Sequence, residues 1–122
     1  MKINSFKDLI VWQKSIELVD RIYKIADKLP KHEVYILVSQ MLRAAISIPS
    51  NIAEGYKRSS KLEFLHFLSI AIASAGELET QLIIAKRQYA NINFAEAEGL
   101  VVEVQKMLYV MIKNMKAVSS IR

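Results

Sequence analysis

The spacing of its apolar residues restricts this chain to helices. Between residues 9 and 26 the apolar positions recur every three or four residues, as in an amphipathic helix. These positions are Leu9, Trp12, Ile16, Val19, Ile22, Tyr23 and Ala26. Three further helical segments can be traced, and no segment alternates with the period of two that a half-buried strand requires. The sequence therefore predicts an all-α protein.

Capping residues and helix breakers set the ends of the first two predicted helices. Ser5 is placed to cap the first helix, and the negative charge of Asp8 suits its positive end. Pro30 stops this helix, because a proline disfavours helical geometry at the residue before it. The second helix is predicted to run from about residue 33 to about residue 56, with Gly55 as its end signal.

The third and fourth predicted helices each begin with a capping box. Ser60–Glu63 opens the third helix, which should reach about Tyr89, and Asn93–Glu96 opens the fourth, which should reach about Val118. Because the connections are short, successive helices should be antiparallel neighbours. The expected fold is an antiparallel up-down four-helix bundle that forms a single domain over residues 1–122.

A narrow line of polar residues follows the second helix on an otherwise apolar cylinder. On a helical wheel this line falls within one arc, in which Ile36 is the only apolar member. The polar members are Glu33, Gln40, Arg43, Ser47, Asn51, Glu54 and Arg58. A solvent-facing helix would show a broader polar face. We therefore expect the second helix to be enclosed on most sides, in part by its own chain and in part by a neighbouring copy.

The third helix carries a matching polar line, and the two lines together predict a buried polar or interface stripe. The stripe consists of Gln40, Arg43, Ser47, Pro49, Asn51, Glu54, His66, Ser74 and Glu77. Folding the two helices as a hairpin brings Asn51 level with His66 and Arg43 level with residues 74–77. Because a buried guanidinium needs a partner, Arg43 should reach Glu77, as an ion pair or through Gln40 or Ser74.

Pro49 lies near the middle of the second helix. It removes one helical N–H and crowds the carbonyl of Ala45, so it should bend or divide the helix. Ser47 is placed to cap a restart after such a break, with Pro49 in the first turn. The alternative is that the freed carbonyl groups form a ligand or interface site.

The composition points to self-assembly and away from metal chemistry. Hydrophobic residues make up 52% of only 122 residues, so another copy is expected to bury part of the apolar surface. The chain has no cysteine, which excludes disulfides and thiolate metal sites. Neither His32 nor His66 has a His or Cys partner at ligand spacing. We expect no cofactor, no metal ion and no small-molecule substrate.

The apolar runs are short. The apolar run near the N-terminus, Leu9–Trp12, has only four residues, which is too short for a signal peptide. The longest uncharged apolar stretch, Phe64–Gly76, falls short of the ~18 residues of a membrane span. A soluble cytoplasmic protein without a membrane partner is the expectation.

A basic charge balance favours an anionic partner. Seventeen Lys and Arg residues against twelve Asp and Glu give a net charge of +5, which suits nucleic acid above all. Clustered cations can contact phosphates, and an aromatic ring can stack on an unpaired base. The candidates are Tyr56, Lys57, Arg58, Lys61, Lys86, Arg87, Lys113 and Lys116. The alternative is that these charges only solvate the surface.

Three stretches of the sequence resemble a known family. QMLRAAISIPSNIAEGYKRSS at residues 40–60 follows FKDLIVWQKSIEL and precedes FLSIAIASAGELETQL. They resemble the four-helix-bundle proteins encoded in 23S rRNA intervening sequences, which are similar in turn to the accessory variability determinant protein of diversity-generating retroelements. SIPSNIAEG at residues 47–55 is the most specific part, and the resemblance covers nearly the whole chain.

The resemblance implies a homopentameric ring with a basic surface and no catalytic activity. The retroelement relatives bind a reverse transcriptase and nucleic acid, which implies a scaffold or RNA-associated role here. Two positions depart from the family pattern. Leu42 stands where the family often has a second basic residue, so the sequence does not support a pair of basic residues that binds phosphate. Ala73 stands where the family often has Gly. The matching residues are Trp12, Gln13, Tyr23, Glu33, Gln40, Arg43, Ser47, Pro49, Asn51, Glu54, Gly55, Arg58, Ser74 and Glu77.

The sequence therefore predicts a non-enzymatic binding or scaffold protein. It is expected to form a homopentamer and to associate with RNA or with an RNA-bound protein, such as a ribosomal or reverse-transcriptase complex. Two alternatives stay open. One is a purely structural oligomer without affinity for nucleic acid. The other is a helical-bundle ribonuclease that uses Arg58 and His66, although such ribonucleases space the Arg and His more closely.

Overall fold

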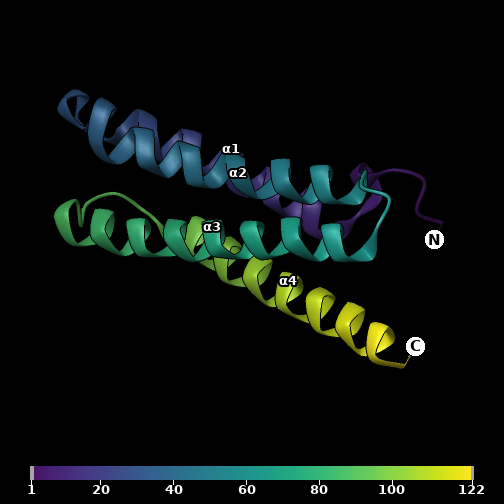
Figure 1. Ribbon diagram of the computed structural model, residues 1–122. Helices are drawn as coiled ribbons and strands as arrows, with labels where there is room; N and C mark the ends of the chain where they lie inside the picture. The colour runs from purple at the N-terminus through teal and green to yellow at the C-terminus, as the bar shows by residue number, and fades with distance from the viewer. Residues whose placement is uncertain (1, 122) are drawn as a thin grey trace.

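The computed structural model of the protein describes residues 2–121, with side chains described through residue 118. Within this range it has four α-helices and no strand (Figure 1), which confirms the all-α prediction. The helices are α1 (Ile10–Lys28), α2 (Ser39–Tyr56), α3 (Lys61–Gln88) and α4 (Ala95–Ile121). Two 3₁₀ turns, η1 (Phe6–Asp8) and η2 (Lys31–Glu33), and a π-helical turn, η3 (Val34–Val38), complete the chain.

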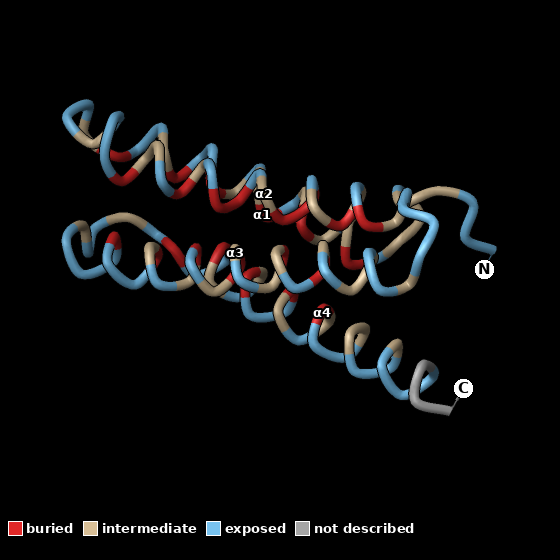
Figure 2. The backbone as a smooth tube through the Cα atoms, in the orientation of Figure 1, coloured by how far each residue is buried: buried red, intermediate tan, exposed pale blue. Residues whose placement is uncertain are grey.

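All four helices contribute to one hydrophobic core. Figure 2 shows the buried residues on the sides of the helices that face one another, and the exposed residues on the outside. The largest fully buried hydrophobic side chains are Leu18, Ile22, Met41, Ile48, Ile52, Leu68, Leu78, Leu82, Val101, Val104 and Leu108. One polar residue, Ser15, is also fully buried, and its hydroxyl donates to the carbonyl of Trp12 at 2.7 Å.

The face predicted for the first helix is rotated from the observed core face. Of its seven predicted apolar residues only Ile22 is buried, and Tyr23 is 50% exposed. The buried residues of α1 are Val11, Ser15, Leu18, Ile22 and Ile25, because a second line of residues follows the neighbouring face of this helix with the same period.

The first helix begins later than predicted. Ser5 and Asp8 form the expected capping box, in which Ser5 Oγ accepts from Lys7 N at 3.1 Å and Asp8 Oδ2 accepts from Ser5 N at 3.2 Å. They cap the short turn η1, however, because Leu9 adopts an extended backbone with φ −72° and ψ 125°. The α-helix itself starts at Ile10.

The second helix also begins later than predicted. The turn η2 is tighter than an α-helix, and the turn η3 that follows it is wider. In the π-helical turn η3 only Leu37 is buried. Tyr35 is 93% exposed and Ile36 is 63% exposed. A π turn shifts the side chains off the 3.6-residue period, so a helical wheel drawn through residues 33–56 misplaces its first turns.

Pro49 does not divide α2. It is buried inside an uninterrupted helix, and Ser47 caps nothing there. Instead Ser47 Oγ shares a hydrogen bond with Ser74 Oγ of α3 at 2.8 Å. Because proline lacks an N–H, the carbonyl of Ala45 loses its helical donor while the rest of the helix continues.

The second helix ends at Tyr56, as predicted, but Gly55 lies within it and is not its end signal. No glycine has a positive φ among the described residues, so Gly55 is not needed for left-handed geometry. A Cβ atom at this position would lie 2.8 Å from Phe67 Cβ and 2.9 Å from Phe64 Cδ1. Gly55 therefore allows α2 and α3 to approach closely.

The predicted starts of the last two helices are close to the observed ones. Ser60 Oγ accepts from Glu63 N at 3.1 Å and caps α3, as expected. Asn93 Oδ1 accepts from Ala95 N at 2.9 Å where α4 begins. Toward the C-terminus, α4 diverges from α3 (Figure 1). Met111, Ile112 and Met115 of this part of α4 are only partly buried against the shared core.

Two helical stretches are long and apolar enough to cross a membrane by length and composition alone. They are Lys31–Tyr56, with a hydropathy of 1.2, and Lys61–Gln88, with a hydropathy of 1.4. The sequence analysis expected no such segment because it counted only runs without any charged residue. These two helices contain a few charged residues, widely spaced, so their average composition is still apolar. Only 39% and 28% of their most apolar windows are buried inside the protein. These helices thus carry more apolar surface than one chain covers.

Candidate functional site

A polar groove follows the contact between α2 and α3. Its cavity has a volume of about 380 Å³ and is lined by Gln40, Arg43, Ala44, Ser47, Ser74 and Glu77. The Ser47–Ser74 hydrogen bond joins the two helices, and Asn51 Nδ2 donates to Ser47 O at 2.8 Å and to Ser47 Oγ at 2.9 Å. The structure thus brings together polar residues that the helical wheels placed on two separate helices.

Within one chain, most of the predicted polar stripe is uncovered. Pro49 is buried, and Ser47, Asn51 and Ser74 are half-buried. The exposed members are Gln40, Arg43, Glu54, His66 and Glu77. The chain's own helices therefore do not cover these five residues, and the part of the enclosure assigned to a neighbouring copy stays a prediction.

The predicted pairing of Arg43 with Glu77 does not form within the single chain. Arg43 and Glu77 line the same groove, but neither forms an ion pair or a hydrogen bond among the side chains described. Both lie in solvent, where an ion pair gains little. The Ser47–Ser74 bond further brings Asn51 level with about Ile70, so Asn51 and His66 are offset by about one helical turn.

One amide in the α2–α3 contact lacks a partner. Gln81 Oε1 is buried and accepts no hydrogen bond among the described residues. A buried acceptor without a donor is costly. The polar line of α3 therefore retains an unmet hydrogen-bonding group that wheel analysis could not reveal.

The predicted nucleic-acid residues divide between the two ends of the molecule. Lys86 and Arg87 lie in the last turn of α3, and Lys86 Nζ is 3.4 Å from Glu98 Oε1. The other six lie at the opposite end, where the α2–α3 turn and the C-terminal part of α4 occur together (Figure 1). The eight residues therefore do not form one continuous surface on a single chain.

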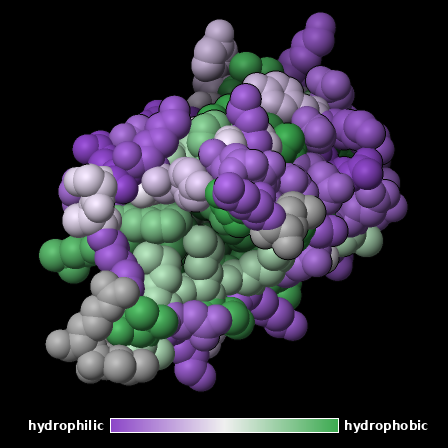
Figure 3. Space-filling model, turned by 90° about the vertical axis from the view of Figure 1, so that its right-hand side faces the viewer, coloured by the Kyte–Doolittle hydropathy of each residue, from purple (hydrophilic) through white to green (hydrophobic). Residues whose placement is uncertain are grey.

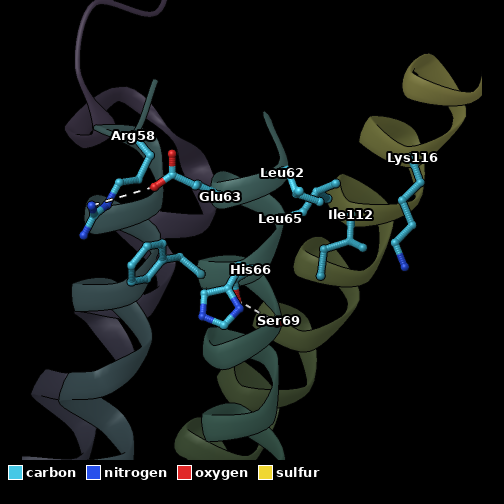
Figure 4. A pocket seen from close by; sticks show the side chains of 9 residues that line it. Arg58, Leu62, Glu63, Leu65, His66, Ser69, Ile112 and Lys116 are labelled. Carbon is cyan, nitrogen blue, oxygen red and sulfur yellow. Dashed lines mark hydrogen bonds and ion pairs between the residues drawn. The ribbon is translucent and has the colours of Figure 1, made fainter. Parts of the chain in front are cut away.

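Two of the six residues at this end are engaged within the chain. Arg58 Nη2 lies 2.8 Å from Glu54 Oε2, Arg58 Nη1 lies 3.8 Å from Glu63 Oε2, and the guanidinium covers the ring of Phe67 at 4.9 Å (Figure 4). The ring of Tyr56 packs edge-on against Phe64, with centroids 6.2 Å apart. These contacts leave Arg58 and Tyr56 poorly placed to serve as a phosphate ligand and a stacking platform.

Four lysines at this end have no carboxylate partner among the described side chains: Lys57, Lys61, Lys113 and Lys116. The ammonium group of Lys57 lies 5.2 Å from the ring centroid of Phe6. Lys57 and Lys61 flank the α2–α3 turn, and Lys113 and Lys116 belong to the C-terminal part of α4, at the same end of the molecule (Figure 1). We call these four residues the lysine cluster.

The described residues give two observations on the residues that a metal enzyme or the ribonuclease alternative would use. They include no group of three or more His, Cys, Asp or Glu side chains able to hold a metal ion. Arg58 and His66 line the same surface hollow, but two carboxylates already hold the guanidinium of Arg58. The ring of His66 packs edge-on against Phe67, with centroids 5.5 Å apart.

The sequence analysis missed a small titratable cluster at the other end of the molecule. Tyr89 Oη donates to Glu33 Oε2 at 2.5 Å and lies 3.4 Å from His32 Nε2. The hydrogen bond to Glu33, with a smaller contribution from burial, raises the pKa of Tyr89 above its ordinary value of 10.0. Residues 33 and 89 meet because the turn η2 lies beside the end of α3, which no local pattern reports.

Comparisons with known proteins agree on a family. A family model described as 23S rRNA-intervening sequence protein matches residues 7–110. A crystal structure of a protein of unknown function from the S23 ribosomal protein family of Bacteroides thetaiotaomicron is similar, with a TM-score of 0.78 and 29% sequence identity. The similarity covers 85% of this chain and 99% of that chain. No curated protein matches the chain.

Proposed function

This chain belongs to the 23S rRNA-intervening sequence protein family, and we propose from this premise that it is a non-enzymatic, self-assembling scaffold that associates with RNA. The observation that carries the RNA part of the proposal is the lysine cluster. The observation that carries the assembly part is the apolar surface that one chain leaves uncovered.

The amount of exposed surface supports assembly. The chain has 7563 Å² of accessible surface, whereas a monomer of 13.9 kDa is expected to have about 6,700 Å². The difference of about 900 Å² resembles the ~800 Å² that each partner contributes to a standard interface. The accessible surface of one chain thus exceeds the expected value by about the area that one partner contributes to an interface.

Another copy suits this surface better than lipid does. The groove between α2 and α3 holds Arg43 and Glu77. They lie near the middle of the two apolar stretches Lys31–Tyr56 and Lys61–Gln88, where charges in a bilayer are costly. A neighbouring copy could supply opposite charges to both. We therefore propose a soluble, cytoplasmic assembly in which antiparallel up-down bundles associate through the α2–α3 groove. The Ser47–Ser74 bond and the packing of Gly55 on Phe64 and Phe67 support the antiparallel arrangement.

The resemblance to family members implies that the assembly is a ring of five chains. In such a ring each lysine of the cluster occurs five times, which converts a modest patch into a basic belt. Sedimentation velocity should then give five times the 13.9 kDa mass of one chain. Arg43→Met should reduce assembly with the helical content intact, whereas Arg87→Met removes the same charge at the end of α3 and should not. An unchanged oligomer in Arg43→Met would count against this interface.

Salt dependence tests the RNA proposal. Each phosphate contact adds about 0.7 to the log–log slope of single-stranded binding against salt concentration. Changing Lys57, Lys61, Lys113 and Lys116 to Gln together should therefore lower the slope by up to ~3 per chain. The matched control changes Lys24, Lys28, Lys31 and Arg87 to Gln, which removes the same net charge at the other end. If the slope falls equally in both variants, RNA binding depends on the net charge alone and not on the lysine cluster.

The same titration separates the alternatives. A wild-type chain that assembles but shows no salt-dependent binding to RNA would favour a purely structural oligomer. RNA degradation that is lost in His66→Ala would favour the ribonuclease. The resemblance to retroelement accessory proteins implies association with an RNA-bound protein. In that case the lysine cluster should contact the RNA of the complex. Variants of the four lysines should then bind the complex more weakly than the wild type, and their affinity should depend less on salt.

A further inference from the structure

An apolar surface with cations at its margins surrounds the first turns of α3. It is a hollow of about 710 Å³. Figure 4 shows Leu62 and Leu65 of α3 and Ile112 of α4 facing one another between the two helices. Leu62 is 78% exposed, so the chain itself does not cover this surface. In Figure 3 hydrophobic atoms form a broad area between hydrophilic side chains at this end of the molecule.

The C-terminal part of α4 builds one wall of this hollow. Ile112 and Lys116 belong to that part, and the family match ends at residue 110. The match thus covers the core of the bundle but not this wall. Because α4 diverges from α3 here (Figure 1), the space between the two helices opens to solvent.

The α4 margin of the hollow is positively charged. Lys116 stands there without a carboxylate partner among the described side chains, whereas Arg58 on the α2 side is already paired with Glu54 and Glu63. Lys61 and Lys113 lie on the same two helix ends and have no carboxylate partner among the described side chains. A ligand of this surface therefore needs an apolar face and negative flanks.

We propose that this hollow is a docking groove for an amphipathic helix of a partner protein, with acidic residues beside its apolar face. Helices bind such grooves by apolar side chains at positions i, i+4 and i+7, and the open space between two diverging helices suits a third helix. A second copy is a poor occupant, because the exposed apolar segment of its own α4 carries Lys106, Lys113 and Lys116 and would bring like charges together. Charge complementarity thus selects an acidic partner.

The groove overlaps the proposed RNA surface at one margin. Lys116 lines the groove and belongs to the lysine cluster, and Lys61 and Lys113 lie on the same two helix ends. An acidic helix in the groove would therefore compete with RNA. The apolar floor belongs to the groove alone. Variants of the floor therefore test docking while they leave the lysine cluster unchanged.

The test uses the full chain and two fluorescent helical peptides of about 18 residues. Both peptides carry Leu at i, i+4, i+7 and i+11. The first has Glu at the flanking positions, and the second has Lys there. Anisotropy titrations should show saturable binding of the Glu peptide and none of the Lys peptide. Leu62→Asp should weaken binding of the Glu peptide about tenfold or more, whereas Ile84→Asp, an exposed aliphatic position at the far end of the same helix, should not.

Charge reversal and self-association complete the test. Lys116→Glu should weaken the Glu peptide several-fold, with Lys28→Glu as the matched control. Equal binding of both peptides, or no binding at about 1 mM, would overturn the proposal. So would a Leu62→Asp chain that sediments at a lower mass on its own, since a second copy would then occupy the groove. Binding of dodecanoate at Leu62 without binding of the Glu peptide would assign the groove to small amphiphiles instead.

Discussion

Gly55 is the position where one added methyl group should cost the most. Its Cβ would lie 2.8 Å from Phe67 Cβ, 2.9 Å from Phe64 Cδ1 and 3.3 Å from the carbonyl oxygen of Phe64. Phe67 Cβ is attached directly to the backbone of α3, so it cannot move away by rotating a side chain. Gly55→Ala must therefore push α2 and α3 apart.

Two opposing effects set the size of the loss. Alanine is favoured over glycine inside a helix by about 1 kcal/mol. Overpacking of a close contact costs about 1–3 kcal/mol. We expect Gly55→Ala to lower the free energy of unfolding by about 1 kcal/mol, which corresponds to a fall of roughly 3–6 °C in Tm for a domain of this size.

Two other glycines provide matched controls. A Cβ at Gly99 has no atom within 4 Å, and a Cβ at Gly76 has only Gln105 Oε1 at 3.8 Å. Gly99→Ala and Gly76→Ala should therefore each raise the free energy of unfolding by up to about 1 kcal/mol. Urea unfolding followed by circular dichroism at one fixed protein concentration measures all three, since assembly makes stability depend on concentration. A Gly55→Ala chain as stable as Gly99→Ala would refute the close approach of α2 and α3.

Two further contacts make testable predictions. Because hydrogen bonding to Glu33 raises the pKa of Tyr89 above 10.0, this bond should stabilise the fold below pH 10 and the contribution should vanish as pH rises through the raised pKa. Glu33→Gln should return Tyr89 toward its ordinary pKa in an absorbance titration, with Tyr89→Phe to identify its signal, and an unchanged curve would contradict this. A double-mutant cycle of Ser47→Ala and Ser74→Ala should give a coupling of about 1 kcal/mol, whereas strict additivity would show that the bond is not formed.

Local chemistry determined much of the fold in advance. The Ser60 cap depends on residues three apart, and its hydrogen bond to Glu63 N forms as the sequence predicts. The capping box of Ser5 and Asp8 is likewise local. The amphipathic period predicted the helix over residues 9–26, because each turn of a helix repeats the same direction. Of the residues it marked only Ile22 is buried, however, and the core residues Leu18 and Ile25 lie off the predicted face.

The candidate site was only partly predictable. Helical wheels placed Ser47 and Ser74 on polar lines, but their mutual hydrogen bond depends on how far one helix slides along the other. The same offset separates Asn51 from His66. The lysine cluster joins the α2–α3 turn to the end of α4, and the groove at Leu62 exists only because α4 diverges there.

The sequence by itself determined the four helices and the caps at Ser60 and Asn93, because these depend on contacts within one or two helical turns. The tertiary structure alone decided which side of α1 faces the core, that Gly55 serves close packing, and which cations have carboxylate partners within the chain. The physical reason is distance along the chain. Side chains from different helices meet according to the axial offset and crossing of those helices, and many offsets satisfy the same apolar period.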